Sequence, residues 1–214
     1  MIQHSTQTHT GFSLIELIVS LGLFSVVITV SVGSLLVLIG ANQREQATQN
    51  IMTNLAFSLD SMTREIRTGF DYYCEGFTDL QVTSAFANQE SITGQNSCPD
   101  GISGTDNHIG ISVIEGGCSI TGCDPADPIR IAYWIDFTEQ AIFRRVGNGT
   151  AERITSSGIN VIDGEFIVTN AERLTAGDTN QPIVTIYIEA EDVTGDTPNT
   201  VRLQTTITQR TLDI

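Results

Sequence analysis

A long apolar run near the amino terminus dominates the pattern of the chain. Leu17–Ala41 spans 25 residues without a charged side chain. As a helix it covers roughly 37 Å at about 1.5 Å per residue, more than the apolar core of a bilayer, which is about 30 Å thick. The apolar part of a secretory signal peptide has only about 7–15 residues. We therefore predict a membrane-inserted helix over 12–41, because no other part of the chain is apolar enough to enclose it as a buried core helix.

Beyond Ala41 the helical period continues while polar residues become common. Gly69 is a natural helix end. The pattern predicts one helix from about Phe12 to Thr68, whose apolar half protrudes and whose amphipathic half, 42–68, packs on a head domain. The apolar side chains of this second half recur every three or four positions and share one face: Ala47, Ile51, Leu55, Leu59, Met62 and Ile66.

The remainder of the chain reads as a β-rich head preceded by a polar segment. Residues 69–128 are rich in Gly, Asn, Asp, Ser and Thr, and we expect a loop-rich insert there with one clear strand at 110–115 and a short one at 80–86. From 129 to 214, alternating apolar and polar positions predict an antiparallel β head. Its expected strands are 130–137, 141–146, 159–169 (interrupted near Asp163-Gly164), 183–192 and 201–211, with hairpins joining the first two and the last two. The fold class is therefore α+β.

Charge is segregated along the chain. The sequence has 25 acidic and 10 basic residues, a net charge of −15, and every basic residue is Arg. Residues 69–214 hold 21 of the acids and seven of the arginines, so the head alone has a net charge of −14. Such a surface repels phosphate, which excludes non-specific binding to nucleic acid and argues against docking on anionic lipid headgroups.

One carboxylate lies at the start of the apolar run. The polar residues 1–10 are followed by Gly11-Phe12-Ser13-Leu14-Ile15-Glu16-Leu17. A charged carboxylate costs a few kcal/mol at the centre of a bilayer. Glu16 therefore either lies at the membrane interface, as charged residues near helix ends often do, or is held for a contact with another molecule.

This segment resembles the class III signal of type IV prepilins and type II secretion pseudopilins. The resemblance implies that a prepilin peptidase cuts between Gly11 and Phe12, removes the leader 1–11 and N-methylates Phe12. It also implies that Glu16 pairs with the terminal amine of a neighbouring subunit when 12–41 becomes part of a filament core. Unlike most prepilin leaders, this one contains no Lys or Arg.

The resemblance further implies a pilin-like fold and a bacterial location. The chain is expected to cross the inner membrane once, with its head on the outer, periplasmic or extracellular side, and then to join other pilins or pseudopilins in a filament. Its partners would be those subunits, the prepilin peptidase that also acts as N-methyltransferase, and the inner membrane, but no nucleic acid.

The head also resembles a subgroup of these proteins. The succession Arg130–Asp136, Ile142–Arg145, Ile159–Val168 and Thr208–Arg210 is similar to J-type minor pseudopilins and W-type minor pilins. It implies a minor structural subunit that lies at the filament tip and initiates assembly. The alternative is a membrane-anchored extracellular β domain, an adhesin or binding module, without filament assembly.

Catalytic signals are absent from the sequence. No GxSxG, HExxH, Walker or GxGxxG spacing occurs, and cleavage after Gly11 would leave His108 as the one histidine. We expect no enzyme activity.

Small residues recur within the apolar run. Ser25, Thr29 and Gly33 have a spacing of four, which either allows close packing of helices or is simply tolerated in lipid.

The cysteines and some acidic residues leave further sites open. Four cysteines can pair in three ways, and in an oxidising compartment we expect Cys74–Cys98 and Cys118–Cys123. A four-cysteine zinc site is the competitor, although no CxxC spacing is present. No cofactor is expected, with weak Ca²⁺ candidates in two acidic loops: Asp124, Asp127, Glu189, Asp192 and Asp196.

Overall fold

A computed structural model gives the fold of the chain. It describes residues 11–77, 95–102, 108–114, 129–147, 149–171, 180–193 and 199–210. The fold is α+β, with one long N-terminal helix followed by antiparallel sheets. The chain divides into two compact units, Met1–Gln46 and Ala47–Ile214.

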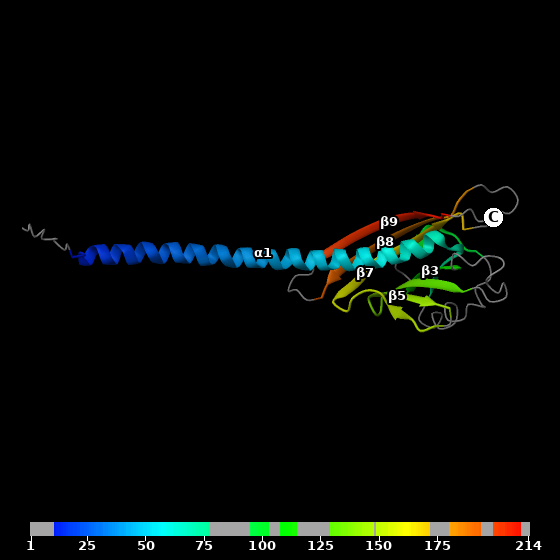
Figure 1. Cartoon of the computed structure of the whole chain (residues 1–214), viewed down its shortest axis with the longest axis horizontal. Helices are drawn as coiled ribbons and strands as arrows, with labels where there is room; N and C mark the ends of the chain where they lie inside the picture. Colours follow the sequence, from blue (N-terminus) through cyan, green and yellow to red (C-terminus); the bar gives the residue numbers. More distant parts are fainter. Residues whose placement is uncertain are drawn as a thin grey trace, which may run out of the picture. The chain divides into compact units, whose positions relative to one another are not determined.

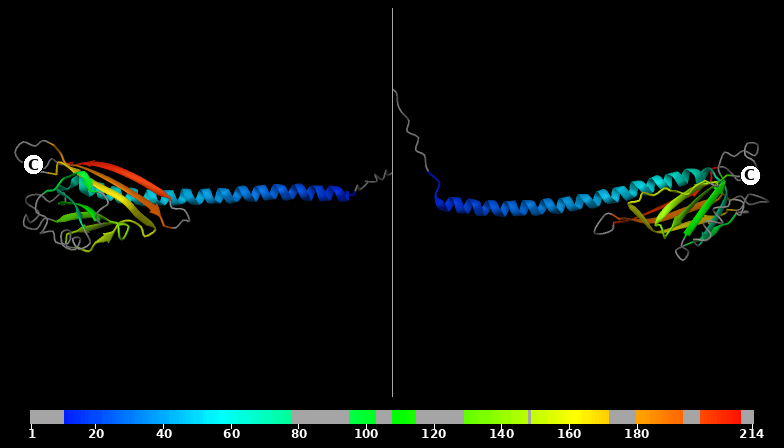
Figure 2. Two further views of the ribbon diagram at one scale, coloured as in Figure 1. Left: turned by 180° about the vertical axis from the view of Figure 1, so that it is seen from behind. Right: turned by 90° about the horizontal axis from the view of Figure 1, so that it is seen from below.

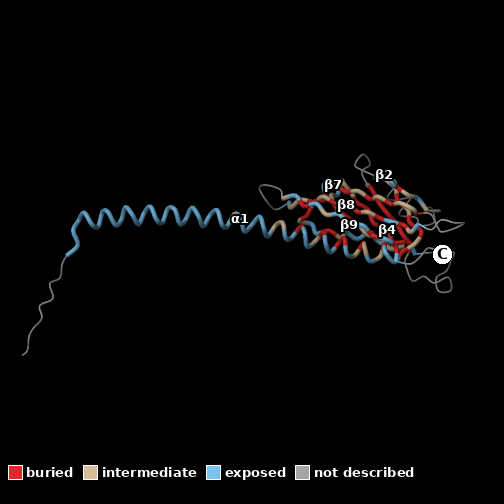
Figure 3. Tube along the Cα trace, turned by 90° about the horizontal axis from the view of Figure 1, so that it is seen from above, coloured by how far each residue is buried: buried red, intermediate tan, exposed pale blue. Residues whose placement is uncertain are grey.

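The first unit contains the start of helix α1 (Leu14–Thr68, 55 residues), which ends where predicted and begins two residues after the predicted Phe12. Every residue from Gly11 to Ile39 is exposed (pale blue in Figure 3), including all the large apolar side chains of the uncharged run. Within the described residues, α1 alone is long and apolar enough to cross a membrane. By length and composition, this half of α1 therefore fits a single-pass membrane anchor.

The second half of α1 belongs to the other unit and buries one face. The predicted stripe is confirmed except at Ala47, which is half-buried, and Ser58 joins it. The helix ends as predicted at Thr68. A Cβ on Gly69 would lie 2.7 Å from a methyl carbon of Val113, so a larger residue cannot take this place without displacing the strand. The buried positions of the stripe are the following: Ile51, Leu55, Ser58, Leu59, Met62 and Ile66.

Among the described residues of the second unit, nine strands form two antiparallel sheets. Figures 1 and 2 show how the labelled strands of these sheets are arranged. The five-stranded sheet has the order β1-β3-β4-β5-β6, and the four-stranded sheet has the order β2-β7-β8-β9. The strands are β1 (Phe70–Phe77), β2 (Cys98–Ile102), β3 (His108–Ile114), β4 (Arg130–Asp136), β5 (Ala141–Val146), β6 (Glu152–Arg153), β7 (Ile159–Thr169), β8 (Ile183–Asp192) and β9 (Thr200–Thr208).

The core unites the stripe of α1 with inward-facing residues of both sheets. Strand β8 shows the alternation expected for a sheet covered on one face, because Val184, Ile186 and Ile188 are buried while the residues between them are half-buried. The predicted β4–β5 and β8–β9 hairpins are confirmed. The expected interruption of β7 is a register shift between Val161 and Asp163.

The segment 69–128 contributes more to the sheets than the sequence suggested. The strand expected at 110–115 is β3, but β1 and β2 were not predicted. Strand β1 lacks regular alternation, since Asp71 has a φ of 61° and the register shifts between Phe70 and Tyr73. Strand β2 contains Pro99 and a left-handed Gly101, both typical of turns. The expected strand 80–86 lies outside the described residues.

Two boundaries in the C-terminal part also differ from expectation. Strand β9 ends at Thr208 and not at 211. Beyond it, the Arg210 N–H donates to the Arg67 carbonyl at the end of α1 (2.8 Å), which replaces sheet pairing by a contact with the helix. The two-residue strand β6 was not predicted, because a segment this short has no detectable period.

Truncation of the buried face of α1 should destabilise the head, whereas truncation of its exposed face should not. Leu55→Ala should lower the free energy of unfolding by about 2–5 kcal/mol, because Leu55 is fully buried. Phe57→Ala, on a side chain that is 73% exposed, should change it by less than about 0.5 kcal/mol. Urea unfolding of the full chain in detergent, followed by fluorescence of the buried Trp134, measures both; equal losses would contradict this packing of α1.

Candidate functional site

The segment that carries the expected processing site lies directly before α1. Gly11, Phe12 and Ser13 are exposed and non-helical. The helix begins where the N–H groups of Glu16 and Leu17 donate to the Ser13 carbonyl at 3.1 and 3.3 Å. The Gly11–Phe12 peptide bond therefore lies outside helical structure.

Glu16 is an isolated charge on an apolar helix. It lies in the first turn of α1, where the helix dipole favours a negative group. The next charged residue along the helix is Arg44, 28 residues on, or roughly 42 Å at 1.5 Å per residue. Glu16 has no ion pair with any described residue. Its carboxylate is therefore available to a cation on another molecule.

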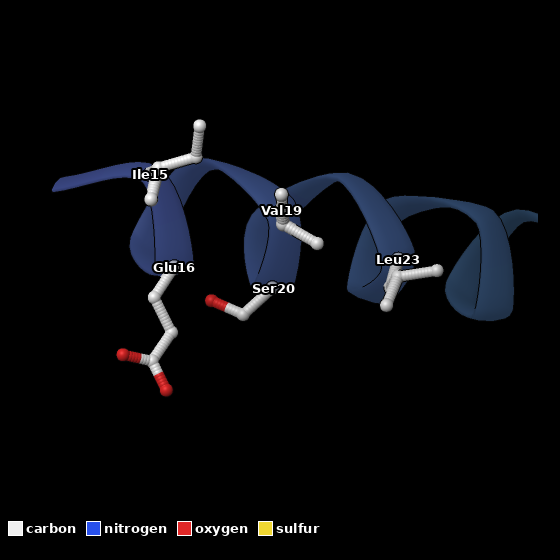
Figure 4. Close-up of a pocket in the computed structure, with 5 residues that line it drawn as sticks. All are labelled: Ile15, Glu16, Val19, Ser20 and Leu23. Carbon is white, nitrogen blue, oxygen red and sulfur yellow. The ribbon is translucent and has the colours of Figure 1, made fainter. Parts of the chain in front are cut away.

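The surroundings of Glu16 are a shallow, open face of the helix. Figure 4 shows the carboxylate pointing away from the helix on the same side as Ser20, whereas Ile15 points to the opposite side and Val19 and Leu23 lie on the face between them. The Ser20 hydroxyl donates to the Leu17 carbonyl (3.0 Å), so it does not occupy the carboxylate. The face is lined by Ile15, Glu16, Val19, Ser20 and Leu23.

The small polar residues of the apolar run satisfy their own hydrogen bonds. The Ser25 hydroxyl donates to the Leu21 carbonyl (2.7 Å), and the Thr29 hydroxyl donates to the Ser25 carbonyl (2.8 Å). A Cβ added to Gly33 would meet nothing within 4 Å. These positions therefore suit an apolar environment without a partner, and their role in packing against another helix stays a prediction.

A disulfide connects the two sheets. Cys74 in β1 and Cys98 in β2 are bonded, with Cα atoms 5.9 Å apart, which agrees with the expected pair. Both residues are buried, and a bonded pair of this kind cannot ligate zinc. The other expected pair, Cys118–Cys123, lies outside the described residues.

One of the calcium candidates already has a cationic partner. Glu189 accepts hydrogen bonds from Arg202 Nε (2.7 Å) and Nη2 (3.0 Å) and from the Tyr187 hydroxyl (2.8 Å). Arg202 first, and then Tyr187, lower the pKa of the Glu189 carboxyl. A calcium ion at this carboxylate would have to displace the guanidinium group.

Of the other four calcium candidates, Asp192 lies within the described residues. Asp192 ends β8 and lies opposite Ile159 of β7. Asp124, Asp127 and Asp196 lie outside the described residues. Within the described residues, no group of three or more His, Cys, Asp or Glu side chains could hold a metal ion. The expectation of no cofactor stays a prediction.

The lone histidine of the expected mature chain is His108. It begins β3 and lies opposite Asp136 of β4. The expected absence of enzyme activity also stays a prediction.

Two polar clusters that the sequence did not predict fix the head. Glu65, on the flank of the buried stripe, accepts from Arg144 Nη2 (2.6 Å) and Nε (3.0 Å) of β5 and from the Tyr133 hydroxyl of β4. Burial, followed by the hydrogen bond to Glu65, raises the pKa of Tyr133. The position of Glu65 next to Ile66 of the buried stripe was a weak indication that its carboxylate is partly buried. Its partners, Tyr133 and Arg144, are too distant in sequence to be recognised from the pattern.

The second cluster lies where the chain leaves α1. Arg130, almost fully buried at the start of β4, donates to the Asp71 carboxylate (2.9 Å), to the Asp71 carbonyl (3.1 Å) and to the Ser112 hydroxyl (3.2 Å). A buried charge needs such compensation, so the cluster holds β1, β3 and β4 in one arrangement. No sequence pattern indicated that Asp71 and Arg130 would meet.

Comparison with known proteins returned no match among protein-family models, curated proteins or solved structures.

Removal of the inter-sheet disulfide should weaken the head. Replacing both Cys74 and Cys98 by Ser should lower the free energy of unfolding by about 2–4 kcal/mol, because the bond closes a loop with a sequence separation of 24. Denaturant unfolding of the full chain in detergent measures the loss. Peptide mapping without reductant is the direct check, and a peptide that joins Cys74 to Cys118 or Cys123 would contradict the pairing.

Proposed function

We propose that this chain is a minor pilin or pseudopilin, a structural subunit of a type IV pilus-like or type II secretion filament. The observation that carries the proposal is Glu16, a carboxylate without a partner among the described residues, at the exposed start of an uncharged helix and four residues after Phe12. The sequence resemblance around Gly11 and Phe12 supplies the processing step.

The proposed assembly exchanges one apolar environment for another. Before assembly, the exposed apolar side chains of 12–41 lie in the inner membrane. In the filament they pack against the same segment of neighbouring subunits. Cleavage after Gly11 creates a cationic amine on Phe12, and Glu16 of a neighbouring subunit meets it. A carboxylate in an apolar environment is tolerated when a cation compensates it, so this pair fixes how far one helix slides along the next.

The head supports delivery to the outer side of the membrane. Disulfides such as Cys74–Cys98 persist in oxidising compartments and are rare in the cytosol of most organisms. Its resemblance to J-type pseudopilins and W-type minor pilins favours a place at the filament tip, where assembly starts. The same span and disulfide also fit an anchored extracellular β domain, an adhesin or binding module that forms no filament, and processing distinguishes the two.

The amino terminus of the protein in its native membrane tests the proposal directly. We expect intact mass and N-terminal sequencing to show loss of residues 1–11 and one additional methyl group on Phe12. An uncut Met1, or cleavage near Ala41, would reject the filament subunit and leave an anchored or released β domain.

Loss of the Glu16 charge should block assembly without affecting insertion. Glu16→Gln should remain in the membrane fraction and still be cleaved, yet be lost from sheared filaments, because the amine of its neighbour would have no counter-ion. Glu45→Gln is the matched control: it removes an exposed carboxylate beyond the uncharged run of the same helix and should be incorporated normally. Immunoblots of membrane and filament fractions measure both, and normal incorporation of Glu16→Gln would remove the role assigned to this residue.

A further inference from the structure

Strand β9 forms an open edge of the four-stranded sheet. It runs for nine residues, pairs with β8 without a register shift, and has no strand on its other side among the described residues. Figure 3 shows it beside β8 at one side of the sheet. The side chains that alternate with its inward-facing residues are all exposed: Thr200, Arg202, Gln204, Thr206 and Thr208.

The other sheet edges in the described part of the chain are protected. The outer side of β1 is bridged by Asn96, which exchanges backbone hydrogen bonds with Tyr72 and Cys74 at 3.1 Å. Strand β2 is short and contains Pro99, and β6 has two residues. Proline, short length and charge are the usual devices that prevent an edge from pairing. Strand β9 has no proline and carries one charge, Arg202.

The backbone groups of β9 that face the open side can be identified. The Gln209 N–H donates to the Pro182 carbonyl (3.2 Å), and the Asp192 N–H donates to the Asn199 carbonyl (3.4 Å). Hydrogen-bonded pairs alternate along an antiparallel ladder, so the odd-numbered residues of β9 direct their N–H and C=O toward β8. The even-numbered residues, centred on Gln204, direct theirs outward and can form hydrogen bonds with an added strand.

The electrostatic character of this edge differs from that of the rest of the head. Residues 197–212 form the longest stretch after Gly69 without an acidic residue. Just past β9, the backbone contact between Arg210 and Arg67 brings the end of the strand to the last turn of α1. Both arginines are exposed, and neither has an ion pair with a described residue. The open edge therefore ends at two available cations.

We propose that the β9 edge binds an extended, acidic segment of a partner protein by β-strand addition. The outward backbone groups of β9 pair with the segment, and its carboxylates contact Arg67 and Arg210. Main-chain pairing of this kind supplies affinity, while side chains supply selectivity. A second copy of β9 fits less well, because it offers no acidic side chain to either arginine. This binding function does not depend on filament assembly.

Peptide binding to the full chain in detergent micelles tests the proposal. The probe is a fluorescent nine-residue peptide of alternating Val and Thr with Glu at both ends, and its matched control has Lys at both ends. Fluorescence anisotropy should show binding of the Glu peptide and much weaker binding of the Lys peptide. Replacing Arg67 and Arg210 together by Gln should weaken binding of the Glu peptide about fivefold, as expected for the exposed ion pairs made by the one terminal Glu that reaches this end of the edge.

A backbone variant separates strand addition from a purely ionic contact. Gln204→Pro removes one outward N–H but no bond to β8, so it should abolish binding, whereas Gln204→Thr, which keeps the N–H, should bind normally. Hydrogen exchange of the Leu203 and Thr205 amides, which face β8, should stay slow in both variants and so show that the sheet is intact. No binding of the Glu peptide, equal binding of both peptides, or binding that survives Gln204→Pro with an intact sheet would each overturn the proposal.

Discussion

The exposed apolar half of α1 is the constraint on which the rest of the molecule depends. From Phe12 to Ile39, side chains that favour burial face outward in every direction around the helix. Soluble monomers rarely expose a continuous apolar surface of this kind, so lipid or other protein must cover it. The second half of the same helix meets the opposite requirement, because it buries a single stripe and leaves polar side chains on its other faces. One helix thus serves two environments, and the change between them falls where charged residues first reappear, at Arg44 and Glu45.

Glu16 distinguishes between the two ways of covering that surface. A purely lipid-anchored helix gains from Glu16 only the modest interaction of a first-turn carboxylate with the helix dipole, and the carboxylate becomes unfavourable wherever it enters the apolar core of the bilayer. In the proposed filament the same carboxylate has a partner of opposite charge. This ion pair favours one relative position of the two helices, which apolar packing alone does not. Aliphatic side chains slide past one another at little energetic cost, whereas an ion pair in an apolar environment has one favourable register. On this proposal, apolar burial holds the helices together, and Glu16 determines their stagger.

The sequence predicted those parts of the structure that depend on local periodicity. The extent of α1 to within two residues, its buried stripe and the two hairpins follow from local signals, namely repeats of 3.6 or two residues and the glycine after Thr68, which each segment carries within itself. Strands β1 and β2 escaped prediction because they are held by partners elsewhere in the chain: β1 by the buried Asp71–Arg130 pair and β2 by its disulfide to Cys74. The Glu65–Arg144 pair was missed for the same reason, since a charge on the flank of a helix looks solvated until the opposing strand is known. Of the candidate site, the sequence identified Gly11, Phe12 and Glu16, and a single chain cannot show the intermolecular contacts that their roles require.

These non-local contacts explain how the head can be both rigid and open to a partner. The disulfide joins an edge of one sheet to an edge of the other, and the Glu65 cluster fastens the five-stranded sheet to α1. Strand β9 lies at the far side of the four-stranded sheet from β2, so an added strand there would extend the sheet without disturbing either connection. The proposed assembly through α1 and the proposed strand addition at β9 therefore use separate surfaces. On these two proposals, the chain keeps its place in a membrane or filament while its head binds an extended segment of another protein.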